Sequence, residues 1–373
     1  MVWLWGAMLG WFGCVVRPSA PDPGLPLDAI EALVRPDVKD RAGWAGDVRS
    51  GLLTAGMTPD ASNVCQVLAV IEQESGYAAD PAVPGLGRIA RAEIEAKLSP
   101  LGPLSGLGAD WLLSAKPEGQ TKTFGERLDA AKTERDLDRL FREILAYHEG
   151  QVPGLQQAGA TLFSGRLERL NPVRTAGSMQ VGVDFAQELG RAEGVPAETV
   201  RELLYTRAGG VRYGTARLFA YRADYDDVVY RFADYNAGLY ASRNAAFQTQ
   251  LAAITGLDLA PDGDLLVYTD AGNVRDGQTM GALLAWRAAS APDLTEAQLR
   301  REVRREKTAA FEQTETWTRV RAQYTAKTGK SPAYARLPDV ALDSPKMTKQ
   351  RTTAWFAQSV DKRYEACIAR GRK

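Results

Sequence analysis

The clearest pattern along the chain is an apolar stripe at helical spacing between Asp60 and Gly76. Apolar residues recur there at intervals of three and four, as on one face of an α-helix. They are Val64, Val67, Leu68 and Ile71. Asp60 precedes the stripe as a helix-starting residue, and Gly76 follows Ser75 as a helix-ending one. We predict a helix that ends at Ser75, with Glu72 and Glu74 in its last turn.

The same periodicity recurs along most of the chain. Helices are predicted near 125–149, 154–169, 182–190, 196–207, 209–222, 225–236, 240–254, 294–328 and 345–370. Gly- and Pro-rich segments between 78 and 125 indicate loops around one short helix, and residues 259–268 predict a turn followed by a short strand. The fold class is therefore mainly α, with a helical domain over 28–258 and a helical C-terminal extension over 259–373.

Residues 1–27 have the outline of an export signal and a tether. An apolar run of 16 residues, too short to span a membrane, precedes a Pro-rich stretch. Cys14 follows Trp-Phe-Gly, an imperfect match to the lipobox of bacterial lipoproteins. We expect Cys14 to carry lipid and to anchor the protein in the periplasm, at the outer membrane. The alternatives are a plain signal peptide and a start codon placed upstream of the true signal.

The composition argues against several kinds of partner and site. Lys plus Arg and Asp plus Glu are both 46, and no basic stripe stands out, so nucleic acid is not an expected partner. One histidine and three cysteines without a C-x-x-C pair argue against a zinc site, and we expect no metal and no cofactor. The histidine, His148, extends the apolar stripe of the helix near 125–149, so we expect it at the edge of the core rather than in catalysis.

Two cysteines remain if Cys14 is acylated. In an oxidising compartment, Cys65 and Cys367 would either form a disulfide that joins the C-terminal helix to the helix ending at Ser75, or stay as two buried thiols. The sequence leaves both possibilities open.

Three short blocks carry a resemblance to a known family. They are IEQESGY from Ile71, RTAGSMQVGVDFA from Arg174 and FADYNAG from Phe232. In this order they resemble the E-S-G-F, G-L-M-Q and A-Y-N-A-G motifs of the soluble lytic transglycosylases, which have the goose-type lysozyme fold. This sequence has Tyr77 for Phe, Ser178 for Leu and Asp234 for Ala. A further segment, GVRYGTARLFA, resembles the family's G-x-x-Y-L helix, and the resemblance covers about residues 60–250.

The spacing of the blocks departs from the family. Its members have about twenty residues between the first two motifs, whereas roughly a hundred separate them here. We therefore expect an insertion at about 78–173 in a lysozyme-like core. Its segment VPGLGRIA, from Val83, is similar to one in an uncharacterised group of bacterial lipoproteins with such a core.

The resemblance implies the activity and the site. The family cleaves the β-1,4 bond between N-acetylmuramic acid and N-acetylglucosamine in peptidoglycan and forms a 1,6-anhydro end with one glutamate. Helical periodicity does not choose between Glu72 and Glu74, but the motif implies Glu74, acting first as acid and then as base. Its place at a helix C-terminus and partial burial would both raise its pKa. The substrate-binding residues implied are Ser75, Gly177, Ser178, Met179, Gln180, Tyr235 and Asn236.

Two other functions remain open. A second carboxylate across the cleft, from Asp184 or Asp234, would make the protein a hydrolytic muramidase. A chain that kept the cleft but lost turnover would be a peptidoglycan-binding or scaffold lipoprotein. The expected partners are glycan strands and a membrane reached through the N-terminal lipid, and the sequence names no protein partner.

Overall fold

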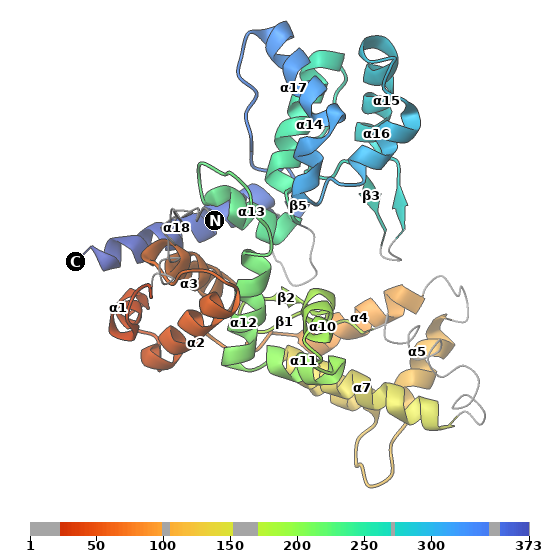
Figure 1. Cartoon of the computed structure of the whole chain (residues 1–373). Helices are drawn as coiled ribbons and strands as arrows, with labels where there is room; N and C mark the ends of the chain where they lie inside the picture. The colour runs from red at the N-terminus through yellow and green to blue at the C-terminus, as the bar shows by residue number, and fades with distance from the viewer. Residues whose placement is uncertain (1–22, 99–104, 152–170, 270–272, 343–350, 373) are drawn as a thin grey trace, which may run out of the picture.

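The computed structural model describes residues 23–98, 105–151, 171–269, 273–342 and 351–372, and it is mainly α-helical (Figure 1). The helix predicted up to Ser75 is α3 (Ala61–Ser75). Asp60 caps it by accepting a hydrogen bond from the backbone N–H of Asn63 at 2.8 Å. Gly76 ends it in the left-handed conformation, with φ 57°. The expected export signal and Cys14 lie outside the described residues.

The first of two hydrophobic cores surrounds α3. It unites α1 (Leu27–Leu33), α2 (Arg41–Thr54), α10 (Val183–Ala192), α11 (Ala197–Leu204), α12 (Arg207–Leu218), α13 (Val229–Ala237) and α18 (Thr353–Gly371). Helix α12 packs along α2, and α18 packs along α3 and α13. A short antiparallel hairpin, β1 (Thr175–Ala176) and β2 (Val181–Gly182), leads into α10.

The segment that we expect to be an insertion forms helices that pack on the same core. It contains α4 (Leu86–Leu98), α5 (Ser105–Ser114), α6 (Phe124–Ala130) and α7 (Glu134–Gln151). The single helix predicted near 125–149 is thus two helices, and the one predicted over 154–169 lies outside the described residues. His148 is buried on α7, where its Nε2 lies 3.1 Å from the Leu112 carbonyl oxygen, and burial lowers its pKa.

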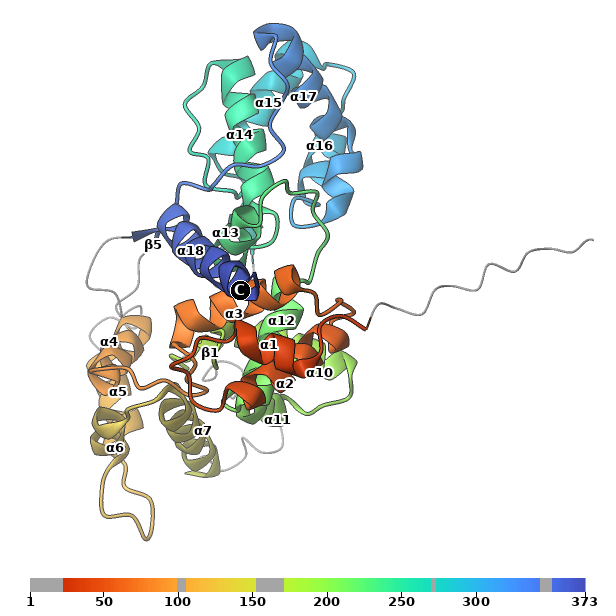
Figure 2. The same ribbon diagram turned by 90° about the vertical axis from the view of Figure 1, so that its left-hand side faces the viewer.

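A second core belongs to a separate lobe. This second lobe contains α14 (Ala241–Thr255), β3 (Val267–Tyr268), β4 (Val274–Arg275), α15 (Gln278–Ser290), α16 (Glu296–Val303), a 3-10 turn (Ala309–Gln313) and α17 (Glu315–Thr328). In both Figure 1 and Figure 2 it stands on one side of α13 and α18, and the insertion helices extend from the other side of the molecule. None of the described helices is long and apolar enough to cross a bilayer.

The two cores divide the chain differently from the boundary expected at 258. Phe247, Leu251 and Ile254 of α14 pack into the second core, whereas α18, beyond the antiparallel pair β5 (Ala341–Leu342) and β6 (Arg351–Thr352), returns to the first. The sequence predicted a helix near 240–254 but not which core it joins. Of the two possibilities for the cysteines, the structure contains the disulfide: Cys65 of α3 and Cys367 of α18 are joined, with a Cα–Cα distance of 5.5 Å.

Candidate active site

A cavity of about 940 Å³ opens beside the C-terminal end of α3. Its walls come from the end of α3, the insertion, the β1–β2 hairpin, helices α12 and α13, and the segment that begins α18. The polar and aromatic residues that line it include Glu74, Glu134, Gln180, Tyr235, Asn236 and Trp355. Segments that are far apart in the sequence thus meet in one cleft.

Glu74 lines this cleft, and Glu72 does not. The Glu72 carboxylate accepts a hydrogen bond from Arg35 Nη1 at 3.2 Å and lies 3.6 Å from Arg363 Nε. No hydrogen bond reaches the Glu74 carboxyl group from the described residues. Burial raises the pKa of Glu74 to about 8, and the negative charge of Glu134 adds to the shift. Near neutral pH, Glu74 is therefore mainly protonated and open to the cleft.

Glu134 is a second carboxylate in the cleft that the sequence reasoning missed. It is the first residue of α7, is only 3% exposed, and accepts a hydrogen bond from Gln180 Nε2 at 2.9 Å. Its neighbour along α7, Asp138, pairs with Arg201 of α11 at 2.6 Å. Ion pairs between α7 and α11 therefore hold the helix that places Glu134 opposite Gln180.

Those ion pairs gather on Glu202 of α11. Its carboxylate accepts hydrogen bonds from Arg135, Arg139 and Arg142, all on α7, at 2.5–3.2 Å. Arg139 contributes most to lowering the Glu202 pKa to about 2. Because α11 belongs to the first core, this network fixes the insertion to it.

The second motif forms a tight turn that carries Gln180 into the cleft. Gly177 has φ 80°, and a Cβ there would lie 2.2 Å from the Leu204 carbonyl oxygen, so only glycine fits. The Gln180 backbone N–H donates to the Gly177 carbonyl oxygen at 3.0 Å. Thr175 Oγ1 donates to Gln180 Oε1 at 2.9 Å, which leaves the Gln180 amide nitrogen directed at Glu134. The side chain is thereby fixed at both ends.

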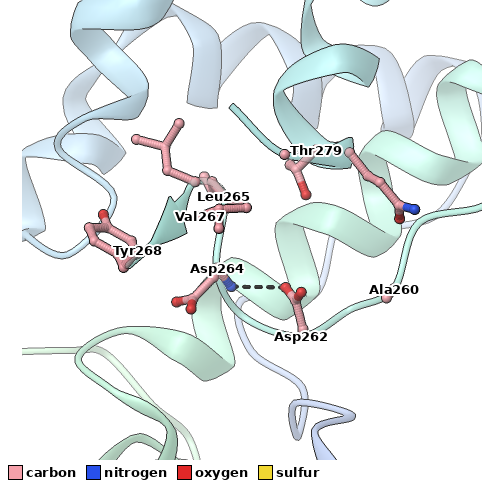
Figure 3. Close-up of a pocket in the computed structure, with 10 residues that line it drawn as sticks. Ala260, Asp262, Asp264, Leu265, Val267, Tyr268 and Thr279 are labelled. Carbon is pink, nitrogen blue, oxygen red and sulfur yellow. Dashed lines mark hydrogen bonds between the residues drawn. The ribbon is translucent and has the colours of Figure 1, made fainter. Parts of the chain in front are cut away.

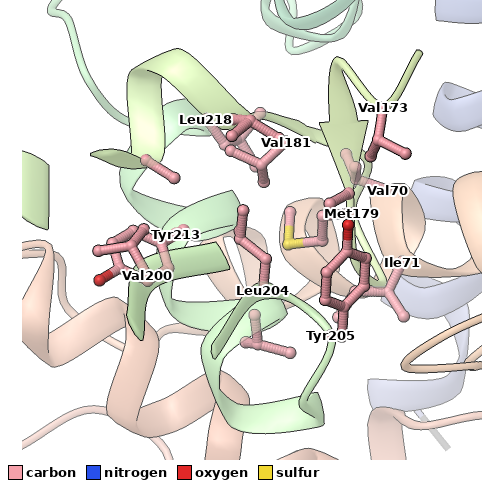
Figure 4. Packing of buried hydrophobic residues seen from close by; sticks show 14 of the residues in the cluster. Val70, Ile71, Val173, Met179, Val181, Val200, Leu204, Tyr205, Tyr213 and Leu218 are labelled. Atoms are coloured by element: carbon pink, nitrogen blue, oxygen red, sulfur yellow. The ribbon is translucent and has the colours of Figure 1, made fainter. Parts of the chain in front are cut away.

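Met179 and Ser178 lie beneath the turn, outside the cavity lining. Both are fully buried, and Figure 4 shows Met179 among apolar side chains that include Ile71 and Leu204. Gly177 and Ser75 are also absent from the cavity lining, and Ser75 Oγ donates to the Ile71 carbonyl oxygen at 3.0 Å. The structure places these four residues behind the cavity lining, where they support the backbone around Glu74 and Gln180, and their contact with substrate stays a prediction.

Tyr235 and Asn236 both come from the third motif. They lie next to each other on α13 and line another wall of the cleft. The Tyr235 hydroxyl donates to the Met179 carbonyl oxygen at 2.7 Å, which ties α13 to the turn. Burial raises the pKa of Tyr235, and the nearby Glu74 charge adds to this, so its hydroxyl stays protonated. Asn236 Oδ1 accepts from Thr353 Oγ1 of α18 at 3.2 Å.

Neither aspartate considered as a second carboxylate faces Glu74. Asp184 is exposed in the first turn of α10, outside the cavity lining. Asp234 is fully buried on the side of α13 toward the second lobe, where it accepts hydrogen bonds from Tyr221 and Tyr225. Successive side chains of a helix are rotated by about 100°, so Asp234 lies about 200° around α13 from Asn236, which lines the cleft.

The chain matches one protein family over residues 37–370, a family described as proteins of unknown function (DUF1615). It belongs to this family. The chain is also similar to the uncharacterized protein YaiW of Escherichia coli (strain K12), with 40% identity over 334 residues, which cover 89% of this chain and 86% of YaiW. No solved structure matches the chain.

The DUF1615 chain has a second, smaller cavity of about 290 Å³ in the second lobe (Figure 3). Its acidic residues already have partners: Asp262 Oδ1 accepts from the Asp264 backbone N–H at 3.0 Å and from Gln248 at 2.7 Å, and Asp264 pairs with Lys307. In the described part of the chain, no three His, Cys, Asp or Glu residues are arranged to hold a metal. The cleft at Glu74 is therefore the better candidate for chemistry.

Proposed function

We propose that this protein is a peptidoglycan lytic transglycosylase with Glu74 as its catalytic residue. One observation carries the proposal: three short motifs separated by long stretches of chain place Glu74, Gln180 and Tyr235 in one cavity. A pKa of about 8 gives the Glu74 carboxyl the protonation state that a general acid needs. The resemblance of the motifs to those of the lytic transglycosylases is the basis for the proposed substrate and for a lysozyme-like fold.

The proposed reaction uses Glu74 twice. Its proton passes to the oxygen between N-acetylmuramic acid and N-acetylglucosamine, the bond from that oxygen to C1 of muramic acid breaks, and an oxocarbenium-like sugar forms. The Glu74 carboxylate then takes the proton of the sugar's own C6 hydroxyl, whose oxygen bonds to C1. The products are a 1,6-anhydro-muramic end and a free N-acetylglucosamine hydroxyl, without consumption of water.

A hydrolytic muramidase is the second candidate, and Glu134 is the observation that favours it. Inverting glycosidases place two carboxyl groups across the bond, with one activating a water molecule. Glu134 lines the same cavity and acts electrostatically on Glu74. We rank this function second because Glu134 is almost fully buried and already holds Gln180, whereas a general base must reach a water molecule beside the sugar.

The cellular setting belongs to the same proposal. A lipid on Cys14 would hold the cleft in the periplasm, at the outer membrane, within reach of the glycan strands. The disulfide between Cys65 and Cys367 suits an oxidising compartment of this kind.

The test is digestion of purified peptidoglycan with the parent protein and with Glu74→Gln, followed by mass spectrometry of the products. We expect 1,6-anhydro-muramic ends from the parent alone. Reducing muramic ends would replace the first candidate with the muramidase. Retained binding to peptidoglycan without new ends would indicate a non-catalytic scaffold.

A further inference from the structure

Two arginines that line the cleft have no carboxylate partner in the described part of the chain. They are Arg217, near the end of α12, and Arg351, in β6. Among the described residues neither guanidinium group forms an ion pair, whereas exposed arginines elsewhere do: Arg212 pairs with Glu193 at 2.6 Å and Arg319 with Asp293 at 2.8 Å. The cleft arginines therefore keep their hydrogen-bond donors for a ligand.

The side chains that line the cleft carry a net positive charge when Glu74 is protonated, although the chain has no net charge. Its charged lining residues are Glu74, Glu134, Arg217 and Arg351. With Glu74 protonated, one carboxylate stands against two guanidinium groups, which leaves one positive charge. A substrate with a negatively charged substituent is complementary to this surface, and a neutral glycan offers no such match.

Arg351 is held in place before any ligand binds. Its guanidinium carbon lies 3.9 Å from the ring centroid of Trp355, a cleft residue that is 37% exposed. Thr352 caps α18 by accepting from the Trp355 backbone N–H at 3.1 Å, and Thr353 contacts Asn236. Helix α13, which carries Tyr235 and Asn236, packs against both α12 and α18. Arg217 thus comes from one helical neighbour of α13, and Arg351 comes from the strand β6 that leads directly into the other, α18.

We propose that Arg217 and Arg351 bind carboxylates of an acidic peptide carried by the glycan strand, so that the protein selects strands that keep their peptides. This inference rests on the proposed function. Peptides attached through the lactyl group of muramic acid contain free carboxylates, whereas the sugar rings themselves carry none. Guanidinium groups suit this role because they recognise carboxylates with paired hydrogen bonds.

The experiment measures equilibrium binding, with Glu74→Gln as the background so that no strand is cut. The probes are fluorescently labelled glycan strands with peptides, and the same strands after an amidase has removed the peptides. Arg217→Gln and Arg351→Gln are compared with Arg319→Gln, which removes the same charge from the surface of the second lobe. Fluorescence anisotropy gives a Kd for each pair.

We expect each cleft substitution to raise the Kd for peptide-bearing strands about tenfold or more, and the Kd for peptide-free strands by about twofold at most. Arg319→Gln should change neither. Equal weakening on both strands would overturn the proposal, since the arginines would then recognise the sugars or the lactyl carboxylate. An absence of weakening would also overturn the proposal. The same holds if the Glu74→Gln protein with both arginines intact binds neither kind of strand. Because binding is measured, a failure of cleavage leaves the result interpretable.

Discussion

Carboxyl groups are buried both in the cleft at Glu74 and at the junction between α13 and α14, beneath the second lobe. The two places surround these groups differently. At the junction, Asp234 accepts hydrogen bonds from Tyr221 at 2.7 Å, Tyr225 at 2.5 Å and the Ser242 backbone N–H at 2.6 Å. In the cleft, Glu74 lines an open cavity and no described residue donates to it.

A second buried acid, which lies within the second lobe, follows the Asp234 pattern. Glu306 is fully buried and accepts from the backbone N–H groups of Leu265 and Leu266 and from the Tyr268 hydroxyl. Burial raises the pKa of Asp234 and Glu306, as it does that of Glu74. A raised pKa alone therefore does not identify a catalytic acid. Access to a cavity and unused hydrogen-bonding capacity separate the cleft from the junction.

The largest expected effect is on turnover, from Glu74→Gln. Glutamine keeps the size of the side chain but cannot donate a proton, so we expect the cleavage rate to fall by about a thousandfold or more. The unfolding temperature should stay the same or rise, because no hydrogen bond is lost. A rate assay and thermal unfolding measure the two. A variant that keeps its activity would remove Glu74 from the proposed mechanism.

Asp234→Asn, at the junction, should lower stability and leave turnover nearly unchanged, the opposite of Glu74→Gln. The amide places an N–H donor where a buried carboxylate oxygen accepts, so the free energy of unfolding should drop by about 1–3 kcal/mol. The activity of the folded fraction should change little. Denaturant unfolding checks this, with Asp293→Asn as the control, because the ion pair of Asp293 with Arg319 is exposed to solvent and contributes little to stability. Equal losses from both variants would contradict the structural role of Asp234.

Glu134→Gln tests the coupling within the cleft. Removing the negative charge makes the loss of the Glu74 proton easier, so the Glu74 pKa falls below about 8. The alkaline limb of the pH–rate profile should move to lower pH by a few tenths of a unit or more, while Gln180 keeps an oxygen acceptor. Glu93→Gln is the control, because Glu93 pairs with Lys97 of the same helix and does not line the cleft. An unshifted limb would show that Glu134 does not act on the acid.

The smallest expected effect comes from Glu202→Gln, on the anchor of the insertion. The Glu202 pKa is lowered from 4.5 to about 2, so its stabilisation is full above pH 4.5 and is lost as the pH falls toward 2. Because the side chain is one-third exposed, we expect a loss of about 1 kcal/mol or less at pH 7. Unfolding at pH 7 and pH 3 measures it, and the difference from the parent should shrink at pH 3. An undiminished difference would place the effect outside these ion pairs.

Much of the local structure of α3 could be predicted from the sequence. An apolar stripe, a capping aspartate and a terminal glycine are short-range signals, and they determine where Glu74 stands on its helix. The motif indicated Glu74 rather than Glu72 as the catalytic residue. The structure adds a reason, because Glu72 pairs with Arg35 and Arg363 outside the cleft.

The rest of the cleft depends on long-range packing. Glu134 lies in an insertion without a family motif, and its one local signal is its position at the start of the most regular apolar stripe of the insertion. Arg351 and Trp355 reach the cleft only because α18 returns to the first core. In the sequence, the one sign of this return was the possible disulfide between Cys65 and Cys367, which the structure contains. No periodicity within a segment shows which other segment covers it.

The most direct test of the account is digestion of peptidoglycan in water enriched in the heavy oxygen isotope, with the new muramic ends weighed by mass spectrometry. In the proposed reaction the C6 hydroxyl, and not water, attacks C1. The account therefore predicts 1,6-anhydro ends that carry no heavy oxygen. Reducing ends that carry it would contradict the account and support hydrolysis with Glu134 as the second carboxylate.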